Sequence, residues 1–213
     1  MKTRTFWFWA IGVAVTDAIF TAWSYGQMPE RIPIHWSAAG KVDAWGSKET
    51  YLLIGPGGMI LAMLLALAIP YLSPPRFKIE PFRDTFYKII LFMIILLGFI
   101  HAFTAMTALN PEKEMGNWLI VGICVFLSLM GNLLGRLKPN FYAGIRTPWT
   151  LSNEEVWRRT HRLGGKLFFF GGILGAILAA LNLLIPAMVV IAIAGSVPVV
   201  YSFVLSKHLE ASS

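Results

Sequence analysis

Six runs of apolar residues constrain the fold of this chain more than any other feature. Each run is long enough to cross the roughly 30 Å hydrocarbon core of a bilayer as an α-helix. The predicted spans lie near Phe6–Ser24, Thr50–Leu72, Tyr87–Ala108, Trp118–Leu134, Leu167–Leu184 and Ile185–Leu205. Only Asn182 and Pro186 interrupt the last two spans, which predicts a tight helical hairpin. The sequence therefore predicts an all-α fold, a polytopic membrane bundle of six transmembrane helices that forms one membrane domain over residues 1–213.

The composition agrees with a membrane protein and excludes several other classes. Apolar residues make up 56% of the chain and charged residues 14%, whereas soluble domains have about 45–50% and about 25%. These values exclude a disordered chain, a coiled coil and a disulfide-stapled secreted fold. The single cysteine, Cys124, has no second cysteine to pair with and indicates neither redox chemistry nor a Cys-based metal site.

The basic residues indicate how the chain is oriented. Of the 18 Lys and Arg residues, 14 lie in the N-terminus, the C-terminal tail and the segments 73–88 and 136–166, and 4 lie in the alternating loops. By the positive-inside rule, both termini are predicted to be cytoplasmic. The net charge of +7 therefore indicates topology, and no direct nucleic acid binding is predicted. The first apolar run is too long for a signal peptide and lacks an A-x-A-like site, so we expect a retained helix.

The predicted external loop, residues 25–49, is longer than a link between spans needs. It contains MPERIPIHWSAAGKVDAWGSK, in which prolines and glycines favour extended pieces joined by a glycine turn. With Trp36 and Trp45 at the membrane interface, the loop would form a small lid over the outer face. Two interpretations remain open: a structural cap, with His35 and Asp43 bonded to backbone groups, or a recognition surface for a molecule that arrives from outside.

The predicted cytoplasmic loop, residues 136–166, contains KPNFYAGIRTPWTLSNEEVWRRTHRLGGK. Ser152 and Glu155 have the spacing of a capping box, which predicts the start of a short cytoplasmic amphipathic helix with Trp157 at the membrane interface. The last turn of this helix carries Arg158, Arg159 and Arg162. These arginines would contact an anionic inner leaflet, and a docking site for a cytoplasmic protein is the alternative.

Both loops resemble signatures of a known family. The segment IPIHWSAAGKVDAWGSK resembles the H-W-x-x-x-G-x-x-D-x-[aromatic]-x-S-K signature of the SdpI-type immunity family, and the cytoplasmic segment is similar to the second signature of that family. The two matches occur in the same order and in the same topological positions as in the family. Ser37 departs from the pattern, because the family more often has Asn or another turn-forming polar residue there.

The resemblance implies a protein of the bacterial cell membrane that protects its host from a secreted, membrane-acting peptide toxin. It also implies a possible second partner, a winged-helix transcriptional repressor that the toxin-engaged protein holds at the membrane. The external recognition residues would be Pro33, His35, Trp36, Gly40, Asp43 and Trp45. The cytoplasmic docking residues would be Asn140, Arg146, Thr147, Trp149, Glu155, Trp157, Arg158, Arg159, His161 and Arg162. The second signature also includes Pro139, Gly144, Pro148, Thr150 and Gly164.

Two polar residues are predicted deep inside the spans. Asp17 and His101 lie at similar depths in the first and third spans, somewhat outside the membrane midplane. A carboxylate at such a position usually faces a partner or a wet cavity. The pair would hold the bundle together, line an outward cavity that binds a toxin group, or relay protons in a small proton-coupled transporter or channel. The transporter alternative predicts helices broken near the midplane and an internal repeat, and neither is evident.

Small residues predict where the helices touch. Gly171, Gly175 and Ala179, and likewise Gly131 and Gly135, recur at four-residue steps that are typical of helix contacts in membranes. The run Gly55–Gly58, which includes Pro56, predicts a loosened helix start near the outer surface.

The sequence contains no motif that indicates catalysis. It has no H-E-x-x-H, no G-x-S-x-G and no phosphate-binding glycine loop. The four histidines are spread over both faces and the interior, so neither a metal site nor a cofactor is predicted. We therefore expect a protein that is not an enzyme.

Overall fold

The computed structural model describes residues 1–113 and 115–211, and this part of the chain contains six helices long and apolar enough to cross a membrane. The spans are α1 (Thr3–Ser24), the continuous segment of α2 (Glu49–Leu52), η2 (Leu53–Gly57) and α3 (Gly58–Leu72), α4 (Arg83–Leu109), α5 (Gly116–Leu134), α7 (Glu154–Ala180) and α8 (Leu184–Ala211). The shorter elements are η1 (Tyr25–Gln27), β1 (Arg31–Trp36), β2 (Val42–Ser47), η3 (Pro75–Phe77), η4 (Glu80–Phe82) and α6 (Pro148–Ser152). The prediction of six spans is confirmed, and the chain is a multi-pass membrane protein.

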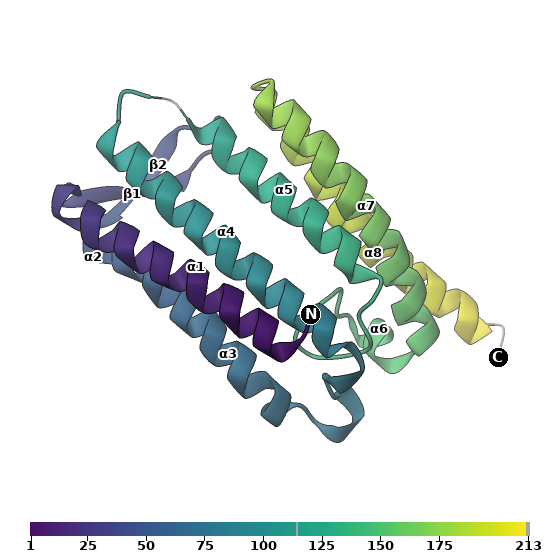
Figure 1. Cartoon of the computed structure of the whole chain (residues 1–213). Helices are drawn as coiled ribbons and strands as arrows, with labels where there is room; N and C mark the ends of the chain where they lie inside the picture. Colours follow the sequence, from purple (N-terminus) through teal and green to yellow (C-terminus); the bar gives the residue numbers. More distant parts are fainter. Residues whose placement is uncertain (114, 212–213) are drawn as a thin grey trace.

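The helices form two groups that meet along α4 and α5. Helices α1, α3 and α4 lie on one side, and α5, α7 and α8 lie on the other (Figure 1). We call the end of the bundle that carries β1 and β2 the hairpin end, and the end that carries both termini the terminal end. Large apolar side chains such as Phe8, Leu53 and Ile185 remain exposed on the outer faces, as expected where lipid tails surround the helices.

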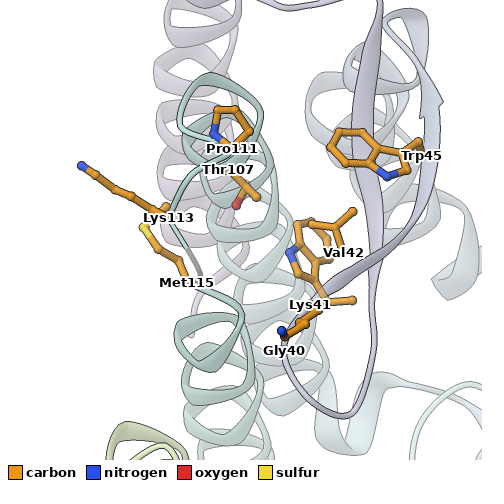
Figure 2. A pocket seen from close by; sticks show the side chains of 9 residues that line it. Gly40, Lys41, Val42, Trp45, Thr107, Pro111, Lys113 and Met115 are labelled. Atoms are coloured by element: carbon orange, nitrogen blue, oxygen red, sulfur yellow. The ribbon is translucent and has the colours of Figure 1, made fainter.

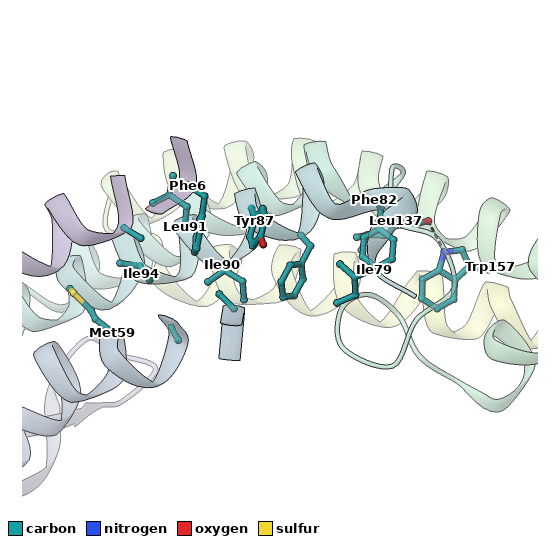
Figure 3. Close-up of a cluster of buried hydrophobic side chains, with 14 residues drawn as sticks. Phe6, Met59, Ile79, Phe82, Tyr87, Ile90, Leu91, Ile94, Leu137 and Trp157 are labelled. Atoms are coloured by element: carbon teal, nitrogen blue, oxygen red, sulfur yellow. Dashed lines mark hydrogen bonds between the residues drawn. The ribbon is translucent and has the colours of Figure 1, made fainter. Parts of the chain in front are cut away.

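The largest apolar core lies between α1, α3 and α4. Phe6 of α1 stacks on Tyr87 of α4 with ring centroids 4.7 Å apart. The same cluster extends along α4 to the terminal end, where it includes Leu137 and Trp157 (Figure 3). The first three spans are thus joined by side-chain packing to the loop that follows α5.

The second group packs through small residues. A Cβ on Gly131 of α5 would overlap the backbone of Phe169 on α7, and one on Gly175 would lie 2.9 Å from the sulfur of Cys124. Ala179 is also fully buried. The predicted contact faces are confirmed at these positions, and Gly135 also faces α7, since an added Cβ there would lie 4.0 Å from the His161 carbonyl oxygen.

The predicted hairpin of the last two spans is confirmed. Helix α7 ends at Ala180 and α8 begins at Leu184. Between them Asn182 has a φ of 62°, a left-handed conformation that asparagine adopts more readily than most residues. Pro186 falls in the first turn of α8, where its missing N–H costs no helical hydrogen bond.

The prediction of a separate short amphipathic helix is wrong. Helix α7 runs unbroken from Glu154 through the fifth span, because Gly164 and Gly165 are packed against neighbouring elements and do not end it. Its N-cap is Asn153, whose side chain accepts hydrogen bonds from the next turn, and Ser152 does not cap it. Trp157 is only 2% exposed, so its indole packs inside the protein and is not available to contact lipid headgroups. The short helix of this loop is α6, which Thr147 and Thr150 cap reciprocally.

Candidate functional site

The predicted extended pieces form a two-stranded antiparallel hairpin. Strands β1 and β2 pair from Arg31 opposite Ser47 to Trp36 opposite Val42, with irregular register around His35. In the turn, the Ser37 N–H donates to the Lys41 carbonyl over 2.8 Å. Gly40 has a φ of 74°, which favours glycine at this position. Ser37, the departure from the family signature, is thus a structural part of the turn.

The hairpin lies across both helix groups. On one side, the Trp36 ring contacts Phe103 of α4 with centroids 5.1 Å apart. On the other, the Gly40 turn rests on the start of α5, so closely that a Cβ on Gly116 would overlap the Gly40 carbonyl. The hairpin therefore connects the two groups at this end of the bundle.

Two hollows flank Trp36. The first is a cavity of about 190 Å³ bounded by the hairpin and the link from α4 to α5, with Trp45, Thr107 and Pro111 in its wall (Figure 2). The second is a groove of about 380 Å³ between α5 and α8, with Trp36 and Ser37 at one end. The remaining wall of this groove is apolar: Leu119, Ile120, Ile123, Cys124, Met188, Ile191 and Ala192. The groove suits an apolar ligand with few polar groups, whereas the first cavity also has Lys41 and Lys113 in its wall.

The structure brings some of the predicted recognition residues together and separates others. Trp36, Gly40 and Trp45 line the first cavity. His35 and Asp43 form a pair at 2.5 Å on the exposed face of the hairpin, and so bond to each other instead of to backbone groups. Pro33 is buried in β1.

Asp17 and His101 are in contact inside the bundle. The His101 Nδ1 and an Asp17 carboxylate oxygen are 2.8 Å apart, and both side chains are almost fully buried. The Tyr51 ring packs at a tilt against the imidazole with centroids 3.9 Å apart, and its hydroxyl bonds with Ser24 over 2.7 Å. Sequence reasoning missed Tyr51 and Ser24, because neither is polar enough to stand out in an apolar span.

The run Gly55–Gly58 leaves room for the imidazole ring of His101. A Cβ on Gly55 would overlap the His101 ring. The chain forms a π-helical turn over Leu53–Gly57, because Pro56 has no N–H to donate to the α-helical pattern. The π-helical turn confirms the predicted loosened helix start. It allows the His101 ring of α4 to lie directly against the backbone at Gly55.

Several polar atoms of this centre have no protein partner. The second carboxylate oxygen of Asp17, the Nε2 of His101 and the Thr104 hydroxyl make no hydrogen bond with any described residue. A groove of about 630 Å³ between α1 and α4 reaches Asp17, with Gly12, Gly98 and Ala102 among its walls. Because buried polar atoms are normally bonded, this centre has unused hydrogen-bonding capacity.

The second signature folds the loop at the terminal end. The Asn140 side-chain oxygen accepts from the N–H groups of Tyr142 and Ala143, and its amide donates to the carbonyls of Lys138 and Ala143. Asn140 is fully buried. It therefore closes a tight turn and presents nothing to a partner.

Trp157 and His161 are also interior groups of this loop. The Trp157 indole donates to the Leu137 carbonyl over 2.8 Å, as the dashed line in Figure 3 shows. His161 stacks on Trp157, and its Nε2 accepts the Ile145 N–H over 3.0 Å. Of the predicted docking residues, those with exposed side chains are Arg146, Arg158, Arg159 and Arg162.

Glu155 neutralises part of this basic surface. It pairs with Arg158 at 2.6 Å and with Arg159 at 2.5 Å.

Trp149 reaches across to α8, where its indole donates to the Ser202 hydroxyl over 2.5 Å. Within residues 1–113 and 115–211, no three His, Cys, Asp or Glu side chains lie close enough to hold a metal ion.

Each of the two signature segments lies within a match to a known protein family or domain. Residues 136–202 match the SdpI/YfhL protein family, and residues 12–60 match a domain of unknown function, DUF1648. The chain is 30% identical over 155 residues to "Immunity protein SdpI" of Bacillus subtilis (strain 168), which covers 73% of this chain and 72% of that protein. No solved structure matches.

Proposed function

Because this chain belongs to the SdpI/YfhL protein family and has a membrane immunity function, we propose that it binds a membrane-acting peptide toxin at the hairpin end. The observation that carries the proposal is the position of Trp36, between a cavity and an apolar groove. An apolar peptide would enter these hollows and lose the freedom to assemble or insert elsewhere in the membrane.

The charge distribution supports placing the hairpin outside the cell. The hairpin end carries 4 of the 18 Lys and Arg residues, and the terminal end carries 14. The positive-inside rule then places both termini in the cytoplasm. A secreted toxin would meet the hairpin first, with Trp36, Trp45 and Asp43 as its contacts.

The test is the survival of a sensitive host that expresses this chain and is challenged with an SDP-like peptide toxin. We expect the double substitution Trp36→Ala with Asp43→Ala to abolish protection at unchanged membrane levels. Trp118→Ala is the matched control, because Trp118 is exposed at the same end but lies on α5, outside the hairpin. Protection that survives the double substitution would move the binding site away from the hairpin, and a wild-type chain that gives no protection would contradict the proposal.

Inward signalling is a separate part of the proposal. A cytoplasmic repressor would contact the exposed arginines Arg146, Arg158, Arg159 and Arg162. Toxin shifts the repressor to the membrane only if the repressor binds the toxin-engaged state more tightly. We expect more repressor to co-purify with the chain when toxin is present, and equal amounts with and without toxin would contradict signalling while leaving protection intact.

A second candidate function, a small proton-coupled transporter, is favoured by the contact between Asp17 and His101. Carboxyl and imidazole groups inside membrane spans are typical of proton pathways, and this pair is buried with polar atoms that bond to no described residue. In vesicles containing the purified chain, this function predicts proton flux that Asp17→Asn abolishes. Absence of flux in the wild-type chain would eliminate this candidate.

A further inference from the structure

A groove of about 300 Å³ lies between α5 and α7 at the terminal end, away from the hairpin and from the Asp17–His101 pair. It is framed by glycines: Gly131 and Gly135 on α5 and Gly165 on α7. At Gly131 and Gly165 the two backbones touch, since a Cβ on either would lie under 3.0 Å from the other helix. At Gly135 an added Cβ would lie 4.0 Å from the His161 carbonyl oxygen, so α7 approaches α5 less closely there than at Gly131 and Gly165.

Two cations that form no ion pair with a described residue lie on the α7 side of this groove. Arg162 and Lys166 are one helical turn apart, so they share a face, and both are exposed. Neither forms an ion pair or a side-chain hydrogen bond with a described residue, whereas Arg158 and Arg159 are paired with Glu155. Positive charge that the chain itself does not neutralise is therefore concentrated at the groove.

The polarity of the groove changes along the helix. Phe170 lies one turn beyond Lys166 on the same face and is 65% exposed, and Phe169 also lines the groove. Within about 5 Å along α7, the wall thus changes from cationic to aromatic. A glycerophospholipid has the same order of groups, with an anionic phosphate followed by an acyl chain.

We propose that this groove binds one anionic phospholipid of the leaflet at the terminal end. Arg162 and Lys166 contact its phosphate, and an acyl chain passes over Phe169 and Phe170. Basic pockets between transmembrane helices are known to hold acidic headgroups. The proposal rests on observations at the terminal end alone and does not require that a toxin binds at the hairpin.

The test is native mass spectrometry of the delipidated, detergent-solubilised chain titrated with phosphatidylglycerol, phosphatidylcholine or inorganic phosphate. We expect saturable binding of one phosphatidylglycerol and much weaker binding of phosphatidylcholine. The double substitution Arg162→Gln with Lys166→Gln should weaken phosphatidylglycerol binding by about 10-fold or more, since each basic residue near a lipid surface contributes a measurable attraction. The double substitution Arg158→Gln with Arg159→Gln removes the same charge from the same helix and should leave binding within about two-fold of the wild-type value.

Gly135 provides a second test that leaves every charge in place. Gly135→Leu would place a larger side chain in the groove that Gly135 lines, and should abolish phosphatidylglycerol binding, whereas Gly135→Ala, whose Cβ would lie 4.0 Å from the His161 carbonyl oxygen, should preserve it. Equal losses in the two arginine-containing double variants, or full binding by Gly135→Leu, would overturn the proposal. So would inorganic phosphate that competes as strongly as the lipid, because the site would then recognise phosphate alone.

Discussion

The two signature regions use their side chains in opposite ways. In the hairpin, His35 and Trp45 are exposed, and Trp36 borders two hollows. In the loop at the terminal end, Asn140, Trp157 and His161 are at most 2% exposed and bond to the loop's own backbone. The difference teaches that the first signature presents a surface, while most of the second signature specifies a fold.

The largest expected effect is on stability, at Trp157. Trp157→Ala would remove a fully packed indole and leave the Leu137 carbonyl without its donor. We expect a loss of about 3–5 kcal/mol in the free energy of unfolding, measured by denaturant unfolding in detergent. Trp36→Ala, a substitution of the same kind in the hairpin, should lower the free energy of unfolding far less. Equal losses of stability in the two variants would contradict the difference between the two signature regions.

Asn140 should have the next largest effect. Asn140→Ala would leave the N–H groups of Tyr142 and Ala143 without their acceptor. We expect destabilisation by about 1–3 kcal/mol, seen as a lower midpoint in the same unfolding experiment. Asn140→Asp keeps the acceptor oxygen and should fall between the wild type and Asn140→Ala; a neutral Asn140→Ala would contradict the structural role of this residue.

Gly116 tests whether protection depends on the position of the hairpin, because the Gly40 turn packs directly against this residue. Gly116→Ala would push a methyl group into the Gly40 carbonyl and displace the turn. We expect a cost of about 1–3 kcal/mol together with loss of protection, because the walls around Trp36 would move. Gly12→Ala is the control, since Gly12 has no atom within 4 Å of an added Cβ. Equal protection by Gly116→Ala and wild type would show that the hairpin position does not matter.

His35 should have the smallest effect. Its contact with Asp43 lies on the exposed hairpin face, where an ion pair typically contributes about 0.2–1 kcal/mol. His35→Ala should therefore shift the unfolding midpoint only slightly. A loss as large as that of Trp157→Ala would show that the hairpin face is a folding element after all.

The sequence predicted the parts of the fold that local patterns determine. Apolar length predicted the six spans. Glycine and proline placement predicted the extended pieces that form the hairpin and the loosened helix start at Pro56, which the structure shows to be a π-helical turn. The continuous α7 was not predictable, because Gly164 and Gly165 look like a break until their packing against Ile145 and α5 is known. Burial of Trp157 was missed for a related reason, since an amphipathic pattern does not reveal which partner covers its apolar face.

The site could be predicted only in part. Asp17 and His101 stood out because charge and imidazole are rare in spans, but their contact depends on how α1 and α4 pack. Tyr51 and Ser24, which surround this pair, and Phe103, which contacts Trp36, carry no sequence signal of their own, because aromatic and hydroxyl side chains are common in membrane helices. The hollows beside Trp36 arise from three helices and a turn that meet only in the folded chain.

The most direct test compares two tryptophans, Trp36 and Trp157, in one host. Protection against an SDP-like toxin is measured for Trp36→Ala and Trp157→Ala and divided by the amount of folded chain in the membrane. We predict that Trp36→Ala accumulates normally but protects poorly per folded molecule, whereas Trp157→Ala accumulates poorly but protects normally per folded molecule. The reverse pattern, or equal protection per folded molecule for both, would contradict the division of the chain into a recognition surface and a folding framework.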